Sequence, residues 1–406
     1  MPRHAPRRRR RPLLAAAAVL LIPSTLLLLK VLATEHAGLW LPGQMRDVVD
    51  GRAAGADDTE HLLVIMADHW EPGREEHSRA RAAGWLERFR PISERHRDTR
   101  GRPFRYTWFY PIDRRNPEIL DMLAHEVTAG YGEVEVHWHH HHDDPAAFER
   151  DLIEGLADFR AAGVLPVVDG GLRWAFIHGN WALDNSIDGQ CGMNDEVAIL
   201  QRHGCVMDMT FPAILMPSNP RQPNRLLRMT ETPDARSYDD AREIRVGESE
   251  DEGLLLFQGP LGLDPTNLPV FVEYGALDDA AGTGWAGRVV RPDSPRDYFR
   301  PSRVRAWHRA AIAVEGRPEW TFVKLHAHGM QDEDLMLGGL LDAALDELER
   351  YAQAKGLTLH YVTARETYNV VRAAERGFIG DPADYYDLEI PPAPAATRGL
   401  LVSAAE

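Results

Sequence analysis

Cysteine is scarce in this chain, which carries only Cys191 and Cys205 among its 406 residues. Neither lies in a recognisable nucleophile motif, so a cysteine-dependent enzyme is the weakest interpretation of the pair. In an oxidising compartment the two thiols could form a disulfide and close a loop of moderate length, which would stabilise the fold by about 3 kcal/mol on the chain-entropy model. Two buried free thiols are the alternative.

Positive charge is also lacking beyond the N-terminus. The formal net charge is −16, and residues 1–30 carry Arg3, Arg7 to Arg11 and Lys30 without a single acid. Removing these seven positive charges leaves −23 on residues 31–406. A surface this acidic repels phosphate backbones, and the sequence has no basic stripe outside the N-terminus. Nucleic acid is therefore not the expected partner. The substrate is expected to be neutral or cationic.

One long apolar run occurs, from Pro12 to Leu29, directly after the arginines at 7–11. Basic residues before such a run hold that end in the cytoplasm, which predicts a membrane anchor with the rest of the chain on the periplasmic or extracellular side. Pro23 lies within the run, and a cleaved signal peptide is the alternative. We therefore expect a basic N-terminus and membrane segment over 1–33 and a linker over 34–58.

From residue 59 onward, short apolar runs alternate with amphipathic stretches. This order predicts an α/β fold, either a distorted (β/α)7-type barrel or a related layered fold. Strands are expected at 61–67, 105–110, 132–137, 165–168, 174–178, 205–210, 320–326 and 358–362. Helices are expected at 80–96, 117–128, 145–162 and 335–354. The predicted divisions are a first barrel part over 59–217, an insertion or lid over 218–302, a last barrel part over 303–380 and a tail over 381–406.

A run of histidines follows the third predicted strand in EVEVHWHHHHDD, residues 133–144. Imidazole is a ligand for Zn, Co, Ni or Fe, and residues spaced i and i+4 face one another where a strand end turns into a helix. His137 and His141 have this spacing and are the predicted metal ligands. A solvated run without function is the alternative.

Three other predicted strands end in ionisable residues. Asp68 and His69 end the first strand, and His326 ends the strand FVKLH, with His328 two residues later. His69 or Asp68 would be the third ligand, Asp68 the base, and His326 the general acid, because histidine titrates near neutral pH. Asp208 ends one more strand, where it could hold a catalytic histidine in position.

A last group has the composition of a sugar-binding surface, since aromatic faces stack on sugar rings and amide or carboxylate groups bond hydroxyls. Its predicted members are Trp70, His178, Asn180, Trp181, Asp184 and His328. A tight turn with a packed tryptophan explains the segment 176–185 equally well.

In this order, the segments resemble the polysaccharide deacetylase family, whose members remove acetyl groups from chitin, peptidoglycan and exopolysaccharides. The matching features are the strand ending in Asp68-His69, the His-x-x-x-His at 137–141 and Leu325-His326 late in the chain. The resemblance runs from about residue 61 to 371, with 218–302 extra. It implies a distorted (β/α)7 barrel with an Asp-His-His site for one divalent metal, zinc foremost, and a polysaccharide substrate.

Two departures from the family pattern stand out. His69 replaces the second acid of the first motif, and the arginine-and-proline motif that orients the base is not evident. Two rival functions therefore stay open: a metal-independent glycosidase using carboxylates such as Glu71 and Asp184, and a non-catalytic glycan-binding or assembly protein. A role in metal storage or sensing is a more distant alternative.

Overall fold

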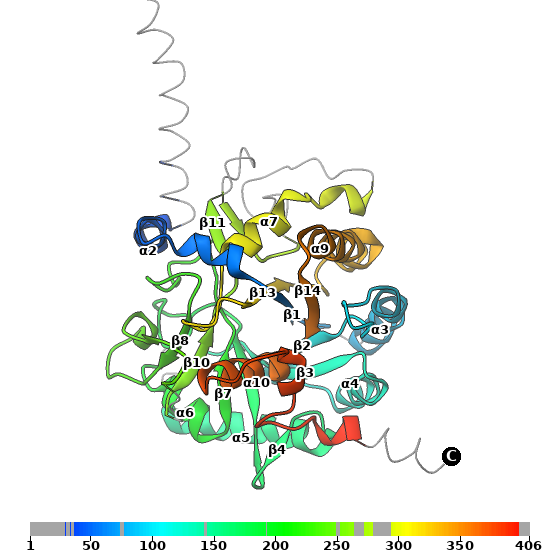
Figure 1. Ribbon diagram of the computed structural model, residues 1–406. Helices are drawn as coiled ribbons and strands as arrows, with labels where there is room; N and C mark the ends of the chain where they lie inside the picture. Colours follow the sequence, from blue (N-terminus) through cyan, green and yellow to red (C-terminus); the bar gives the residue numbers. More distant parts are fainter. Residues whose placement is uncertain are drawn as a thin grey trace, which may run out of the picture.

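The computed structural model describes residues 29, 33, 36–73, 77–141, 144–191, 193–248, 252–263, 272–278 and 294–397 (Figure 1). The predicted membrane segment falls almost entirely outside these residues. Among the helices within the described ranges, none is both long and apolar enough to cross a membrane.

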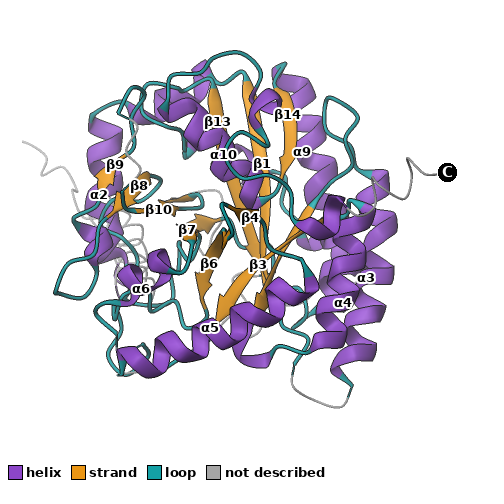
Figure 2. Ribbon diagram, turned by 90° about the horizontal axis from the view of Figure 1, so that it is seen from below, coloured by secondary structure: helices purple, strands orange, loops and turns teal. Residues whose placement is uncertain are grey.

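A large, mostly parallel sheet forms the centre of the protein, which confirms the α/β class (Figure 2). Its parallel strands, in spatial order, are β13 (Trp320–Ala327), β1 (His61–His69), β2 (Tyr106–Pro111), β3 (Gly132–Trp138), β6 (Trp174–His178), β7 (Cys205–Asp208) and β10 (Leu254–Phe257). The antiparallel β8 (Leu226–Met229) and β9 (Arg242–Glu243) follow β10 at that edge. β14 (Thr358–Val362) pairs with the first half of β1, and β2 pairs with its last three residues.

Helices cover the outer face of the sheet. The longer ones are α3 (Ser78–Arg95), α4 (Pro117–Ala129), α5 (Pro145–Ala162) and α9 (Leu341–Lys355); α6 (Glu196–Arg202) and α7 (Ser302–Arg309) are shorter. Local sequence explains the limits of α4 and α5, because Asn116 and Asp144 cap their N-termini and each has proline at its first position. α3 continues through Pro91 to Arg95 rather than ending there.

Helix α10 (Ala364–Glu375) occupies the inner side of the curved sheet, and all of its residues are buried. It lies against β1, β3 and β6 (Figure 2). Its apolar side chains form an inner cluster with residues such as Ile65 and Ile177, to which Val370 belongs. A separate, larger cluster lies between the sheet and the outer helices. The interior therefore consists of two apolar layers, one on each face of the sheet.

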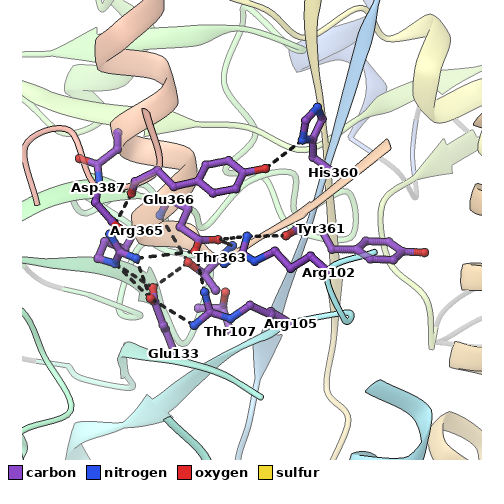
Figure 3. A network of polar contacts seen from close by, with 12 residues as sticks. Arg102, Arg105, Thr107, Glu133, His360, Tyr361, Thr363, Arg365, Glu366 and Asp387 are labelled. Atoms are coloured by element: carbon purple, nitrogen blue, oxygen red, sulfur yellow. Dashed lines mark hydrogen bonds and ion pairs between the residues drawn. The ribbon is translucent and has the colours of Figure 1, made fainter. Parts of the chain in front are cut away.

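Buried ion pairs tie the start of α10 to the start of β3 (Figure 3). Arg365 Nη2 lies 2.9 Å from Glu133 Oε1, and Arg105 Nη1 lies 2.6 Å from Glu366 Oε1. Arg102 also contacts Glu366, through a 3.1 Å contact between its Nη1 and Oε2. Because each buried carboxylate faces guanidinium groups, the charges in this network are compensated.

The segment predicted as a linker over 34–58 is largely helical in the structure. It contains α2 (Ala37–Val49) and the 3₁₀ helix η1 (Arg52–Asp58). Trp40 is fully buried against residues that include Ile214 and Tyr274, so hydrophobic burial holds α2 on the domain. The composition, rich in Gly, Ala and Asp, suggested a tether. The burial of Trp40 instead packs this segment on the domain.

The predicted insertion over 218–302 is partly integral to the sheet, because β10 pairs in parallel with β7. It also contains the hairpin of β11 (Leu261–Leu263) and β12 (Val272–Tyr274). After β12 the chain runs beside the end of β13, where Leu277 N donates to the carbonyl of His326 at 2.8 Å. This path carries Asp278 to the carboxyl edge of the sheet.

The remaining elements are short. They are β4 (Val167–Val168), β5 (Gly171–Leu172), η2 (Ile112–Arg114), η3 (Ser237–Asp239), η4 (Pro295–Tyr298), α8 (Glu333–Leu335), the π-helical turn η5 (Met336–Leu340) and η6 (Pro382–Tyr385). The helix predicted over 335–354 is thus a π turn followed by α9, with the break at Gly339, where φ is 142°. The predicted tail packs on the domain at Ala393 and Ala395, which are buried.

Candidate metal centre at the carboxyl ends of the strands

The carboxyl ends of the parallel strands meet at one edge of the sheet, and three of them carry ionisable residues at or near their ends. β1 ends at Asp68 and His69, β3 reaches His137 just before its end, and β13 carries His326 as its penultimate residue. Register explains part of this meeting, because Ala67 of β1 lies opposite His326 of β13. The sequence predicted ionisable residues at these strand ends, and their roles in a site stay predictions.

Three of these groups converge closely enough to share one ion: His69, Glu71 and His137, whose donor atoms all lie within 4.8 Å of one another. Nε2 of His137 lies 3.2 Å from Oε1 of Glu71, and Nε2 of His139 lies 3.6 Å from the same oxygen. The imidazole rings of His69 and His137 have centroids 4.7 Å apart. The cluster thus offers two imidazoles and a carboxylate, with a third imidazole beside them.

The tautomer of His137 is set by its surroundings. Its Nδ1 lies 3.0 Å from the carbonyl oxygen of Ile177, which can only accept, so Nδ1 carries the proton. Burial lowers the pKa of His137, so the ring is neutral and the lone pair on Nε2 faces Glu71. A backbone carbonyl that orients the distal nitrogen in this way is the usual support of a metal-bound histidine.

Glu71 is ionised in the same arrangement. Burial opposes its ionisation, but the surrounding His137 and His139 rings and the guanidinium group of Arg114 bring its pKa to about 2. A neutral Nε2 and a carboxylate oxygen are both acceptors, so their contact calls for a cation between them. Nδ1 of His69 is buried and has no hydrogen-bond partner among the described residues. These donors fit a divalent metal such as zinc.

Residues after β2 orient the cluster from the side. Arg114, in η2, places Nη1 2.7 Å from Oε2 of Glu71, so the second carboxylate oxygen is held away from His137. Asp113 accepts a hydrogen bond from the backbone amide of His139 at 3.3 Å and lies 3.6 Å from Nδ1 of its ring. The carboxylate of Glu71 and the ring of His139 are therefore both supported by neighbours.

The two histidines at the end of β13, His326 within it and His328 just after it, differ in charge. Burial, helped by the charge of Lys324, lowers the pKa of His326 to about 3, which leaves its ring neutral. Burial also disfavours charge on His328, but its hydrogen bond to Asp278, 3.3 Å from Nδ1, raises its pKa to about 9. His328 lies next to His69, with ring centroids 4.6 Å apart. His328 is thus the protonated group at the site, whereas the sequence had suggested His326.

Asp68 lies deeper than the histidines. Burial raises its pKa to about 8, against the effect of the Gly329 amide, which donates to Oδ1 at 2.7 Å. Gly329 is required there, because a Cβ at that position would overlap the Asp68 carboxylate. Asp68 is therefore a weakly acidic group held in place next to the candidate ligand His69.

The structure places His141 away from this cluster. The described residues after Trp138, 139–141, are not helical, so the i, i+4 pairing with His137 that a helix would give does not form there. In extended chain, residues i and i+2 share a side, and His139 takes the position beside His137. His141 is exposed instead. His142, in the same run, lies outside the described residues.

The predicted sugar-binding residues separate into two groups. Trp181 lies at the site, with its ring centroid 6.0 Å from that of His69 and 5.6 Å from that of His328. Trp70 is fully buried against Trp85 and Tyr110, and so belongs to the apolar core.

Two further predicted residues have structural contacts instead. The buried carboxylate of Asp184 accepts the amide hydrogen of Ser237. Asn180 donates from its side chain to the carbonyl of Gln190 at 3.1 Å. Both contacts hold loop backbone and are ordinary roles for Asp and Asn in turns.

Asp208, proposed from sequence to hold a histidine, accepts instead from the amide and hydroxyl of Thr210 at 2.9 and 2.8 Å. The Thr210 hydroxyl in turn accepts from the backbone amide of His178 at 2.9 Å. The side chain of His178 faces a different group of residues, formed with His140. Asp208 therefore supports the backbone at the end of β6 rather than an imidazole.

Sequence reasoning missed several site residues. Glu71 had been considered only as a glycosidase carboxylate, and Asp113, Arg114 and Asp278 had not been considered. For Glu71 a signal exists, because the i, i+2 spacing of His69 and Glu71 matches that of His137 and His139. Asp278 has no such signal, since it follows a short strand in a segment of irregular composition.

Comparison with known proteins adds no family assignment. A scan of the chain against protein-family models found no match, and a search of the curated proteins found none either.

Proposed function

We propose that this protein is a metal-dependent hydrolase of the polysaccharide deacetylase type, which removes acyl groups, acetyl foremost, from a cell-surface or exported polysaccharide. The observation that carries the proposal is the neutral Nε2 of His137 facing the ionised carboxylate of Glu71 at 3.2 Å. This pair, with His69 beside it, provides the ligands for one divalent ion, zinc foremost and Co, Ni or Fe as alternatives. His139 is the candidate fourth ligand.

A divalent ion at these ligands supplies Lewis acidity, which polarises an acyl carbonyl and lowers the pKa of water. The side chains of this protein perform the proton transfers. Asp68, in the ionised form that it adopts above its raised pKa of about 8, is the candidate acceptor of the proton from the attacking water. His328, charged through Asp278, is the candidate donor to the leaving amine or alcohol. Trp181 offers its face to the sugar ring that carries the acyl group.

The finer fold assignment belongs to the same proposal. We interpret the curved sheet as a distorted (β/α)7-type barrel whose interior is filled by α10. The reactive groups then lie at the carboxyl ends of the strands, where active sites of such barrels collect. We also propose that the apolar run at 12–29 anchors the chain, with the domain outside the cytoplasm.

The contacts of Asp184 count against the glycosidase alternative. A paired-carboxylate mechanism needs two carboxyl groups that face one substrate. Asp184 is fully buried and its carboxylate is occupied by the Ser237 amide, while Glu71 faces His137 and Arg114.

The test combines metal content with acetate release. The full-length protein, purified in detergent with a tag that contains no histidine, would be assayed for bound metal and for release of acetate from acetylated oligosaccharides. His137→Ala and Glu71→Gln should each abolish both bound metal at this site and acetate release. His141→Ala, an exposed member of the same histidine run, is the matched control and should match wild type.

Wild-type acetate release from the His137→Ala protein would refute the proposal. Loss of activity in His141→Ala alone would instead favour the ligand pair suggested by spacing. Metal and oligosaccharide binding without acetate release in wild type would point to the non-catalytic glycan-binding alternative.

A further inference from the structure

A second group of potential metal ligands lies behind the first and is wholly buried: His140, His178, Cys191 and Glu196. Four separate segments supply these residues. His140 follows β3, His178 ends β6, Cys191 lies in the loop after β6, and Glu196 is the first residue of α6. One donor atom from each lies within 4.8 Å of the others. The convergence is tertiary, because no two of the four are neighbours in one element.

The distances centre on the carboxylate of Glu196. Its Oε1 lies 2.8 Å from Nε2 of His140 and 3.7 Å from Nε2 of His178. Its Oε2 lies 3.4 Å from Sγ of Cys191. The two imidazole rings have centroids 4.5 Å apart. Nitrogen, sulfur and oxygen donors therefore surround one small volume.

The carboxylate of Glu196 faces imidazole, thiol and backbone amide groups, and its Oε2 accepts from the amide of Asp184 at 2.6 Å. Glu196 is fully buried, and within the described part of the chain no lysine or arginine side chain pairs with it. The Nε2 atom of His178 is buried and has no hydrogen-bond partner in the described residues. A buried carboxylate without a compensating charge is costly, and a bound metal ion removes that cost.

We propose that His140, His178, Cys191 and Glu196 bind a second divalent metal ion, in a site separate from the His69, Glu71 and His137 cluster. Two imidazoles, a thiolate and a carboxylate give the tetrahedral set that zinc prefers, and the two anionic ligands balance its charge. Four protein ligands leave no open position for substrate, so the site is structural rather than catalytic. It does not depend on the proposed hydrolase activity.

Binding has a definite proton balance. A bond forms between the metal and Sγ of Cys191, and the thiol proton leaves to solvent, because the thiolate is the form that coordinates. Coordination through Nε2 of His178 places that ring's proton on Nδ1. The contact of the Asn180 amide with Nδ1, 3.2 Å long, gives way in that state.

The ion would fix the loop that serves the first site. Residues 179–190 join His178 to Cys191 and carry Trp181, whose ring faces His69 and His328. The loop already approaches the first cluster closely, since a Cβ at Gly179 would overlap the ring of His139. Metal binding at both ends of this loop, by His178 and Cys191, would therefore fix the position of Trp181 beside the candidate active site.

Cobalt substitution provides the test, because a thiolate bound to Co²⁺ gives a ligand-to-metal charge-transfer band in the near ultraviolet. The full-length protein would be stripped of metal and titrated with Co²⁺ as wild type, Cys205→Ser, Cys191→Ser and His137→Ala. Since the chain has only two cysteines, a band that survives in Cys205→Ser belongs to Cys191 without any change to Cys191 itself. Cys205 is also buried and free, which makes it the matched control.

We expect the band in wild type, Cys205→Ser and His137→Ala, and its loss in Cys191→Ser. Bound zinc should fall from two equivalents to one in Cys191→Ser and, independently, in His137→Ala. Absence of the band in wild type and Cys205→Ser would overturn the proposal and leave a hydrogen-bonded cluster in which the thiol of Cys191 donates to Glu196. If wild type binds only one equivalent of zinc, and this zinc is lost in His137→Ala but kept in Cys191→Ser, the first site is supported and the second is refuted.

Discussion

The substitution Glu366→Gln should destabilise the protein by about 3 kcal/mol, because it removes one charge from the buried ion network of Figure 3. The Glu366 side chain is only 2% exposed, and its carboxylate contacts Arg105 and Arg102. It also accepts from the backbone amide of Thr363 at 3.0 Å and so completes the capping box of α10. Glutamine keeps the shape and one acceptor oxygen but leaves two guanidinium groups facing a neutral amide.

The magnitude follows from the burial of the partners. Removing one member of a buried ion pair costs about 3–5 kcal/mol, since the remaining charge loses its compensation. The lower end applies here, because Arg102 is 25% exposed and can be solvated, and because Arg105 remains 3.5 Å from Glu133. The double variant with Glu366→Gln and Arg105→Met should lose less unfolding free energy than the two single variants lose together, because both substitutions act on one network.

The effect should depend on pH with a definite sign. Burial opposes ionisation of Glu366, but the charges of Arg105 and Arg102 hold its pKa below the ordinary value. A glutamate with a depressed folded pKa stabilises the protein above its unfolded pKa of about 4.3, and this contribution is lost as the pH falls toward the folded value. The difference in unfolding free energy between wild type and Glu366→Gln should therefore be constant from pH 6 to 8 and shrink below about pH 4.3.

Urea denaturation followed by circular dichroism measures these differences. The control is Glu118→Gln, which breaks an exposed pair with Arg79 and should leave the unfolding midpoint unchanged. A Glu366→Gln protein as stable as wild type at pH 7, or a difference that grows in acid, would refute this account of the network.

Three further outcomes are expected from other parts of the structure. Gly155→Ala should lower the unfolding free energy by about 1–3 kcal/mol, because its Cβ would overlap Ile112, and Ile112→Val in the same chain should restore part of the loss in urea titrations. Trp40→Ala should cost about 3–5 kcal/mol, whereas a tether over 34–58 would tolerate it without change in the melting temperature. Trp181→Ala should weaken binding of an acetylated oligosaccharide about tenfold in calorimetry, and an unchanged affinity would exclude stacking on its ring.

The gathering of ionisable groups at one sheet edge was predictable from sequence for a simple reason. Buried strands read as apolar runs, and Asp68, His137 and His326 stand out at their ends. Parallel strands place those ends together, so the α/β class and the location of the site follow from the same pattern. The α/β class is confirmed, and the barrel, the metal and the hydrolase activity stay predictions.

The ligand identities were less predictable, because they depend on local backbone. Choosing His141 over His139 required a helix after His137, and residues 139–141 are not helical. Glu71 and Asp278 lie in loops, and hydrophobic periodicity in the sequence does not predict the course of a loop. The second cluster escaped notice because Cys191 and Glu196 come near His140 only through the packing of separate elements.

The buried position of α10 also governs the order in which the chain can fold. β1, made early, pairs with β13 and with β14, and its inner face is covered by α10 at residues 364–375. Contacts between such distant segments give a high contact order and slow folding. The N-terminal two thirds of the chain therefore leave an apolar sheet face open, together with the positions of β1 that pair with β13 and β14, until nearly the whole protein has been synthesised. We expect chaperones that recognise exposed strands to bind the incomplete chain during synthesis. A chain truncated before residue 358 should aggregate rather than form a smaller domain.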